Sequence, residues 1–171
     1  MYTKLIRNIL IFMGLIVLQL LILDNIRLGS FIHPCVYVLF VLLLPFDTSR
    51  LSLMFNGFII GMVIDVFNGT PGLNAAATVL VAYLRPYIIS LVSRKSELEG
   101  KTYPSITEME LKWFIIYTLL LLIVHNLTLF LLEAFSFKLF GLIMLETLVS
   151  VPVSLIVIIL LMYIFKPIKS K

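Results

Sequence analysis

Long, nearly uncharged apolar stretches occupy most of this 171-residue chain. Hydrophobic residues make up 61% of the sequence and charged residues 13%, whereas a soluble domain has about 45–50% and about 25%. A soluble core of this size has too little interior to bury so many Leu, Ile, Val and Phe side chains, so lipid must solvate many of them. The sequence therefore predicts an integral membrane protein that lies in a lipid bilayer.

The apolar stretches have the length of membrane-spanning helices. A bilayer core of about 30 Å is crossed by about 17–25 helical residues. We predict one all-α transmembrane domain over residues 1–171, with six helices at 8–24, 31–46, 51–68, 73–92, 113–134 and 141–165. In the polar loop 93–112, Ser105 and Glu108 have the spacing of a capping box, which predicts a helix start near Ile106.

Basic residues lie mainly on one side of this predicted topology. With six helices and a cytoplasmic N-terminus, eleven of the 13 Lys and Arg residues fall on the inside, and only Arg27 and Lys138 fall outside. This distribution follows the positive-inside rule. A five-helix alternative with a re-entrant segment 31–46 moves the C-terminal lysines outside or inverts the balance of the first loop. The charges therefore favour six helices with both ends in the cytoplasm.

Gly57, Gly61, Asp65 and Gly69 recur at every fourth position, and such residues share one face of a helix. The first two glycines permit the close approach of another backbone, and we expect them to face the next helix. Asp65 has two interpretations, namely contact with a partner protein or stabilisation by water and the loop that follows. Gly69 is expected to end the helix in the left-handed conformation, and Gly72 to complete a tight reversal.

Other polar residues fall at membrane depth. A polar lining of the outer half of the bundle is one interpretation of four of them: His33, His125, Asn126 and Glu146. Scattered hydrogen bonds between helices are the alternative, which we favour for His125 and Asn126. Arg85 precedes Pro86 near the inner end of its helix, and we expect its side chain to extend toward the lipid headgroups.

Signatures of catalysis and of metal binding are missing from the sequence. There is no glycine-rich phosphate loop, no H-E-x-x-H spacing and no G-x-S-x-G elbow. The single Cys35 excludes an internal disulfide and a thiolate cage. Although the net charge is +4, the basic residues form no continuous patch, which argues against nucleic-acid binding. We expect a non-enzymatic protein without catalytic residues, metal or cofactor.

The run from Gly57 to Pro86, GFIIGMVIDVFNGTPGLNAAATVLVAYLRP, resembles the rod shape-determining protein MreD family. The resemblance rests on a glycine-spaced helix that leads to an aspartate, a turn rich in small residues, a Gly-Leu-Asn-Ala step and a Tyr-Leu-Arg ending. Its motif residues in this chain are Gly57, Gly61, Asp65, Gly69, Gly72, Asn74, Ala76, Tyr83 and Arg85. It implies a fold similar to the six-helix substrate-binding subunit of energy-coupling-factor transporters.

The same resemblance implies a function and a location. MreD-like proteins are multi-pass scaffolds of the bacterial inner membrane that bind MreC, and through it the MreB cytoskeleton and the wall synthases. They support cell shape and lateral peptidoglycan synthesis. The alternative is a vitamin-binding subunit of an energy-coupling-factor-type transporter, because polar residues in the outer half of the bundle can line a pocket. Whether the chain acts as a monomer or a homodimer stays open.

Overall fold

The structure is a computed structural model, and it describes residues 2–25, 32–134 and 140–164. Within these residues, four helices are long and apolar enough to cross a membrane, namely α3 (Arg50–Asn68), α4 (Leu73–Val92), α6 (Leu111–Ala134) and α7 (Phe140–Ile164). The remaining elements are α1 (Tyr2–Val17), a π-helix η1 (Leu18–Leu23) and the short helices α2 (Leu39–Leu42) and α5 (Lys95–Leu98). The chain is therefore an all-helical, multi-pass membrane protein, and four of its predicted helices are confirmed.

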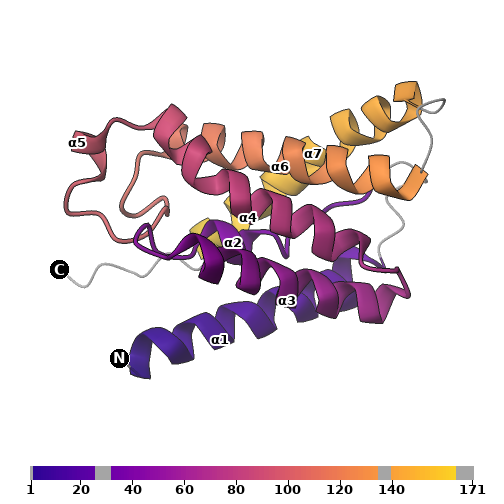
Figure 1. The fold of residues 1–171 in the computed structure, drawn as a ribbon, viewed down its shortest axis with the longest axis horizontal. Helices are drawn as coiled ribbons and strands as arrows, with labels where there is room; N and C mark the ends of the chain where they lie inside the picture. The colour runs from indigo at the N-terminus through magenta and orange to yellow at the C-terminus, as the bar shows by residue number, and fades with distance from the viewer. Residues whose placement is uncertain (1, 26–31, 135–139, 165–171) are drawn as a thin grey trace.

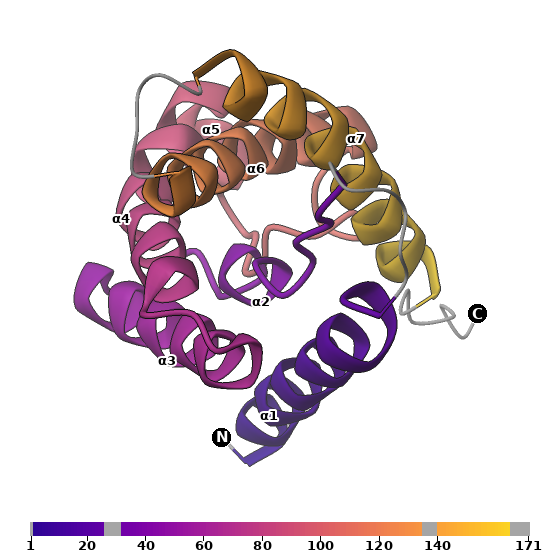
Figure 2. The same ribbon diagram turned by 90° about the vertical axis from the view of Figure 1, so that its right-hand side faces the viewer.

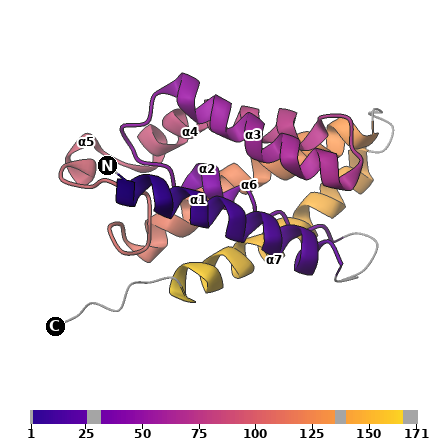
Figure 3. The ribbon, with the colours of Figure 1, turned by 90° about the horizontal axis from the view of Figure 1, so that it is seen from below.

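The longer helices enclose a central segment. Helices α3, α4, α6 and α7 lie along the long axis of the molecule, as Figure 1 shows. Seen down that axis, α1, α3, α4, α6 and α7 surround α2 (Figure 2). The start of α1 and the short helix α5 lie toward the same end of the bundle (Figure 3). The core therefore lies around residues 36–42, which are all buried.

Helices α3 and α4 form a tight antiparallel hairpin. Gly69 ends α3 with φ of 67°, and Gly72 precedes α4 with φ of 83°. Both values lie in the left-handed region, which glycine adopts without steric cost. The turn predicted from the sequence is therefore present, and it fixes the two helices side by side.

The segment predicted as a helix at 31–46 is mostly not helical, and residue 31 lies outside the described residues. Only Leu39–Leu42 form an α-helix, and the chain is irregular from Ile32 to Val36. Irregular backbone at membrane depth is tolerated only where protein or a water-filled cavity surrounds it. Here the protein does so, because every residue from Pro34 to Leu42 is buried.

Side chains from distant helices satisfy the irregular backbone. The His33 and Cys35 N–H groups donate to the hydroxyls of Ser150 and Ser154 at 3.0 and 2.9 Å. Gln19 accepts from the Val36 N–H at 2.9 Å and donates to the Pro34 carbonyl at 2.9 Å. These bonds replace those of a helix, which is why the segment does not need helical geometry.

The first predicted helix, 8–24, is longer and changes character along its length. It begins at Tyr2, and from Leu18 to Leu23 it is a π-helix, in which the Asp24 N–H donates to the Gln19 carbonyl at 2.9 Å. The wider turn places Gln19 in the interior with 3% of its side chain exposed. Gln19 is therefore positioned to bind the irregular segment.

The capping box predicted at Ser105 and Glu108 is wrong. Helix α6 begins at Leu111, and residues 106–108 form a turn. The Glu108 carboxylate instead accepts from the backbone N–H groups of Thr102 and Tyr103. A contact across the loop therefore replaces the local one that the spacing suggested.

Candidate functional site

The Asp65 carboxylate caps the neighbouring helix rather than its own. Its Oδ1 accepts from the Asn74 backbone N–H and the Asn74 side-chain amide, both at 3.0 Å, and from the Thr70 hydroxyl. Its Oδ2 accepts from the Ala75 N–H at 2.8 Å. Helix N-terminal N–H groups lack partners within their own helix and favour negative charge. Asp65, 1% exposed, supplies both the acceptor and the charge to α4.

Gly57 and Gly61 bring α3 and α4 into close contact. A Cβ on Gly61 would lie 2.5 Å from the Ala75 Cα, and one on Gly57 would lie 3.0 Å from the Thr78 carbonyl oxygen. Only hydrogen fits at Gly61, because 2.5 Å is far inside van der Waals contact. Ala76, in contrast, is exposed and does not take part in this contact.

A hydrogen-bonded chain extends from Asp65 into the bundle. The Tyr37 hydroxyl lies 2.8 Å from Asn74 Oδ1, and 2.9 Å from His125 Nε2. Asn74 directs its amide N–H groups at Asp65 and Thr70, so its Oδ1 must accept the Tyr37 proton. His125 must then carry its proton on Nε2 and donate it to the Tyr37 oxygen. His125 is fully buried, and this bond orients its ring.

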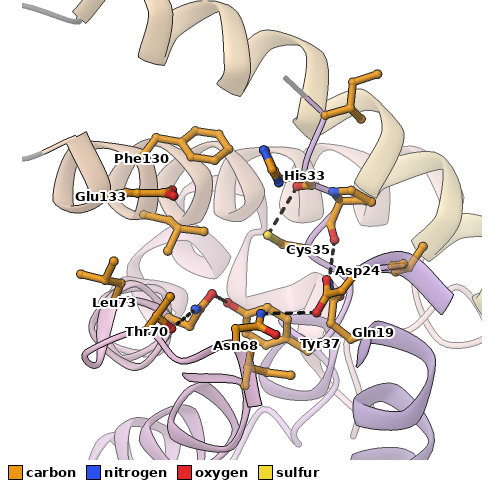
Figure 4. Close-up of a pocket in the computed structure, with 16 residues that line it drawn as sticks. Gln19, Asp24, His33, Cys35, Tyr37, Asn68, Thr70, Leu73, Phe130 and Glu133 are labelled. Carbon is orange, nitrogen blue, oxygen red and sulfur yellow. Dashed lines mark hydrogen bonds between the residues drawn. The ribbon is translucent and has the colours of Figure 1, made fainter. Parts of the chain in front are cut away.

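A polar pocket of about 260 Å³ opens beside these hydrogen-bonded side chains. It lies among η1, the irregular segment, the α3–α4 turn and α6. Asp24 and Glu133 approach it from opposite sides, with His33 and Cys35 between them (Figure 4). Gln19 donates to Asp24 Oδ1 at 2.7 Å, and Asn68 lies 3.3 Å from Asp24 Oδ2. Two carboxylates and an imidazole suit a small solute with hydrogen-bond donors.

The polar residues predicted to line the outer half do not meet in one place. His33 lines the pocket, whereas His125 and Asn126 are completely buried, and Glu146 is not among the lining residues. Several lining residues were not predicted, namely Gln19, Asp24, Tyr37 and Glu133. Asp24 and Glu133 end apolar stretches, which was the available signal, but the sequence offered no means of pairing them.

Arg85 lies inside the protein and does not extend to the headgroups, so that prediction is wrong. It is 1% exposed. Its Nε donates to the Tyr117 hydroxyl at 2.9 Å, and its Nη2 donates to the Leu44 carbonyl. Tyr117 in turn donates to the Leu42 carbonyl at 3.0 Å. Arg85 and Tyr117 therefore hold the C-terminal part of the segment 32–46, where these backbone carbonyls lack helical partners.

Tyr83 occupies a different environment from the other motif residues. It lies on the surface with 43% of its side chain exposed, next to Tyr87 with ring centroids 5.8 Å apart. Tyr87 accepts a hydrogen bond of 3.0 Å from Arg50 on α3. This contact therefore joins the N-terminal end of α3 to the C-terminal half of α4.

Within the described residues, no group of three or more His, Cys, Asp or Glu side chains is arranged to hold a metal ion. Comparison of the chain with protein-family models, curated proteins and solved structures found no match.

Proposed function

We propose that this chain is a non-enzymatic scaffold of a bacterial rod-shape complex, similar to MreD, that binds MreC in the inner membrane. The observation that carries the proposal is the α3–α4 hairpin, which contains the whole run that resembles that family. Asp65, Asn74 and Arg85 are all engaged in hydrogen bonds within the chain. Such a hairpin is suited to rigid support rather than to chemistry.

A scaffold needs surfaces that a partner can contact within the membrane. The outward face of α3 carries Phe55 and Phe67, which are 62% and 69% exposed. Lipid or a partner helix can pack on such a face by van der Waals contact. A partner such as MreC, anchored in the membrane and extending outside, would thereby be held beside the bundle, with MreB and the wall synthases joined through it.

The proposed topology has six crossings, with α1–η1 and the segment 32–46 as the two beyond the four long helices. In this topology the polar pocket lined by Gln19, Asp24 and Glu133 faces the outside and is the outer pocket. The segment 32–46 contacts Gln19 near it, and the end of the segment binds Arg85. Beyond that point the Phe46 N–H donates to the Thr102 carbonyl of the inner loop at 3.0 Å. Extended residues advance about 3.3 Å each. A segment of this length is therefore enough to connect the outer pocket with the inner loop.

Depletion of the protein in its host tests the scaffold function. We expect rod-shaped cells to become round, because lateral wall synthesis would lose its assembled complex. The measurement is cell width by microscopy, with expression of the wild-type chain as the control, together with co-purification of MreC from membranes. Unchanged cell shape together with no recovery of MreC would contradict the proposal.

The outer pocket supports a second candidate, a solute-binding subunit. Its volume of about 260 Å³ lies below the roughly 300–1,000 Å³ typical of sites for drug-sized ligands. A vitamin would therefore fit only after the pocket opened, which is why we rank this function second. The pocket is better matched to a smaller polar solute.

Thermal unfolding of the purified protein tests the second candidate. A ligand at 100 times its Kd would stabilise the folded protein by about 2.7 kcal/mol, which a melting curve detects. Under the scaffold function no water-soluble vitamin binds, so we expect none of them to raise the melting temperature. A rise that is abolished by Asp24→Asn or Glu133→Gln but retained in Glu146→Gln would instead establish a solute site. Glu146 is the matched control, since it does not line the pocket.

A further inference from the structure

A second cavity lies at the inner end of the α3–α4 hairpin, remote from the outer pocket. Its volume is about 830 Å³, and its lining includes Arg50, Arg85 and Arg94, with no carboxylate among the lining residues. Four hydroxyl side chains line it as well, namely Thr48, Ser49, Ser90 and Ser93. Three cations with no carboxylate among the lining residues make a region of positive potential.

Arg85 has hydrogen-bonding capacity left at this cavity. Its Nε and Nη2 are engaged, but its Nη1 has a single long contact of 3.5 Å with the Pro45 carbonyl. All of these partners are neutral oxygens, although the side chain is only 1% exposed. A buried cation normally has a charged partner, so Arg85 favours an anion in the cavity.

Arg50 is held in place at the same cavity. Its Nη1 donates to the Tyr87 hydroxyl at 3.0 Å, and its guanidinium lies 4.9 Å from the Tyr87 ring centroid. Arg50 also begins α3, whose N-terminal N–H groups add partial positive charge. The C-terminus of α4 contributes about half a negative charge, which three full positive charges outweigh.

We propose that this cavity binds the phosphate of an anionic phospholipid headgroup. Guanidinium groups bind phosphate oxygens through paired, charge-assisted hydrogen bonds. The surroundings favour lipid over a soluble phosphate, because Leu51 and Leu91 are 79% and 76% exposed and directly follow the lining residues Arg50 and Ser90. Acyl chains can therefore lie along the same helices. Anionic lipids are concentrated in the cytoplasmic leaflet, where this end of the hairpin is placed.

Lipid titration of the full-length protein in detergent tests the proposal. Dioleoylphosphatidylglycerol should raise the melting temperature more than dioleoylphosphatidylcholine and should be retained in native mass spectra. Arg50→Gln and Arg94→Gln should each weaken phosphatidylglycerol binding about fivefold, and the double variant about 25-fold. Lys112→Gln is the matched control, because Lys112 is exposed and does not line the cavity. Arg85 is left unchanged, since it also holds the Leu44 carbonyl.

Any one of four outcomes would overturn the proposal. Equal stabilisation by the two lipids would exclude recognition of a negative headgroup. An unchanged affinity in the double variant, or an equal loss in Lys112→Gln, would show that the attraction is not local to the cavity. If inorganic phosphate alone stabilised the protein while phosphatidylglycerol did no more than phosphatidylcholine, the ligand would be a soluble phosphate and not a lipid.

Discussion

Gly61→Ala is expected to lower the free energy of unfolding by about 3 kcal/mol or more. The new Cβ would lie 2.5 Å from the Ala75 Cα, 2.7 Å from the Ala75 nitrogen and 2.8 Å from the Asn74 carbonyl oxygen. All three are backbone atoms, so no side-chain rotation relieves the overlap and α3 must move away from α4. That movement would also pull Asp65 from the N–H groups that it caps. Monodispersity in size-exclusion chromatography and the melting temperature measure the loss.

A graded series of glycine substitutions distinguishes this clash from a general effect of substitution. Gly141→Ala is the control, because among the described residues no heavy atom outside the glycine's own stretch of α7 lies within 4 Å of the added Cβ. Alanine is a better helix former than glycine by about 1 kcal/mol, so this variant should be neutral or slightly more stable. Gly57→Ala, with 3.0 Å to the Thr78 oxygen, should fall between the two. Equal melting temperatures across the series would refute the close-packing account.

The hairpin could be predicted in detail because its signals are local. Helices predicted at 51–68 and 73–92 are observed at Arg50–Asn68 and Leu73–Val92. Two glycines with positive φ end one helix and precede the other, and their identity is visible in the sequence. The spacing of Gly57 and Gly61 likewise carried its own information, because residues four apart share a helix face.

The irregular segment could not be predicted, because what stabilises it is distant in sequence. The backbone of His33 and Cys35 is satisfied by Ser150 and Ser154, more than 100 residues away. Without those hydroxyls, an apolar stretch at this depth would have to be helical. Pro34, Pro45 and the short length of the stretch 31–46 were the local indications against a regular helix, but proline is tolerated in membrane helices.

Arg85 was misassigned for a related reason. An arginine near a helix end usually extends to the interface. The sequence does not show that backbone carbonyls in the protein interior accept hydrogen bonds from Arg85. The Leu44 carbonyl accepts from the Arg85 Nη2, and the Pro45 carbonyl lies 3.5 Å from the same nitrogen. Both carbonyls are more than 35 residues away along the chain, so their approach to Arg85 is set by tertiary packing that the sequence does not display.

Asp65→Asn is expected to lower the free energy of unfolding by about 3 kcal/mol, although the two side chains have the same shape. Both carboxylate oxygens of Asp65 accept hydrogen bonds, and their donors include the N–H groups of Asn74 and Ala75. An asparagine amide places two hydrogens where one oxygen stood, so in either orientation at least one donor faces another. Each buried group left without its partner costs about 1–3 kcal/mol, and the attraction of the charge to the α4 N-terminus is lost as well.

This substitution also separates the two interpretations of Asp65. If its role is to cap α4, Asp65→Asn should lower the melting temperature of the purified chain with no partner present. If its role is to contact a partner, the purified variant should melt like the wild type and lose only co-purification of MreC. Asp47→Asn, which alters an exposed acid at the other end of α3, controls for the loss of one negative charge. The four hydrogen bonds to Asp65 favour the first result, because they leave the carboxylate no free oxygen to offer to another protein.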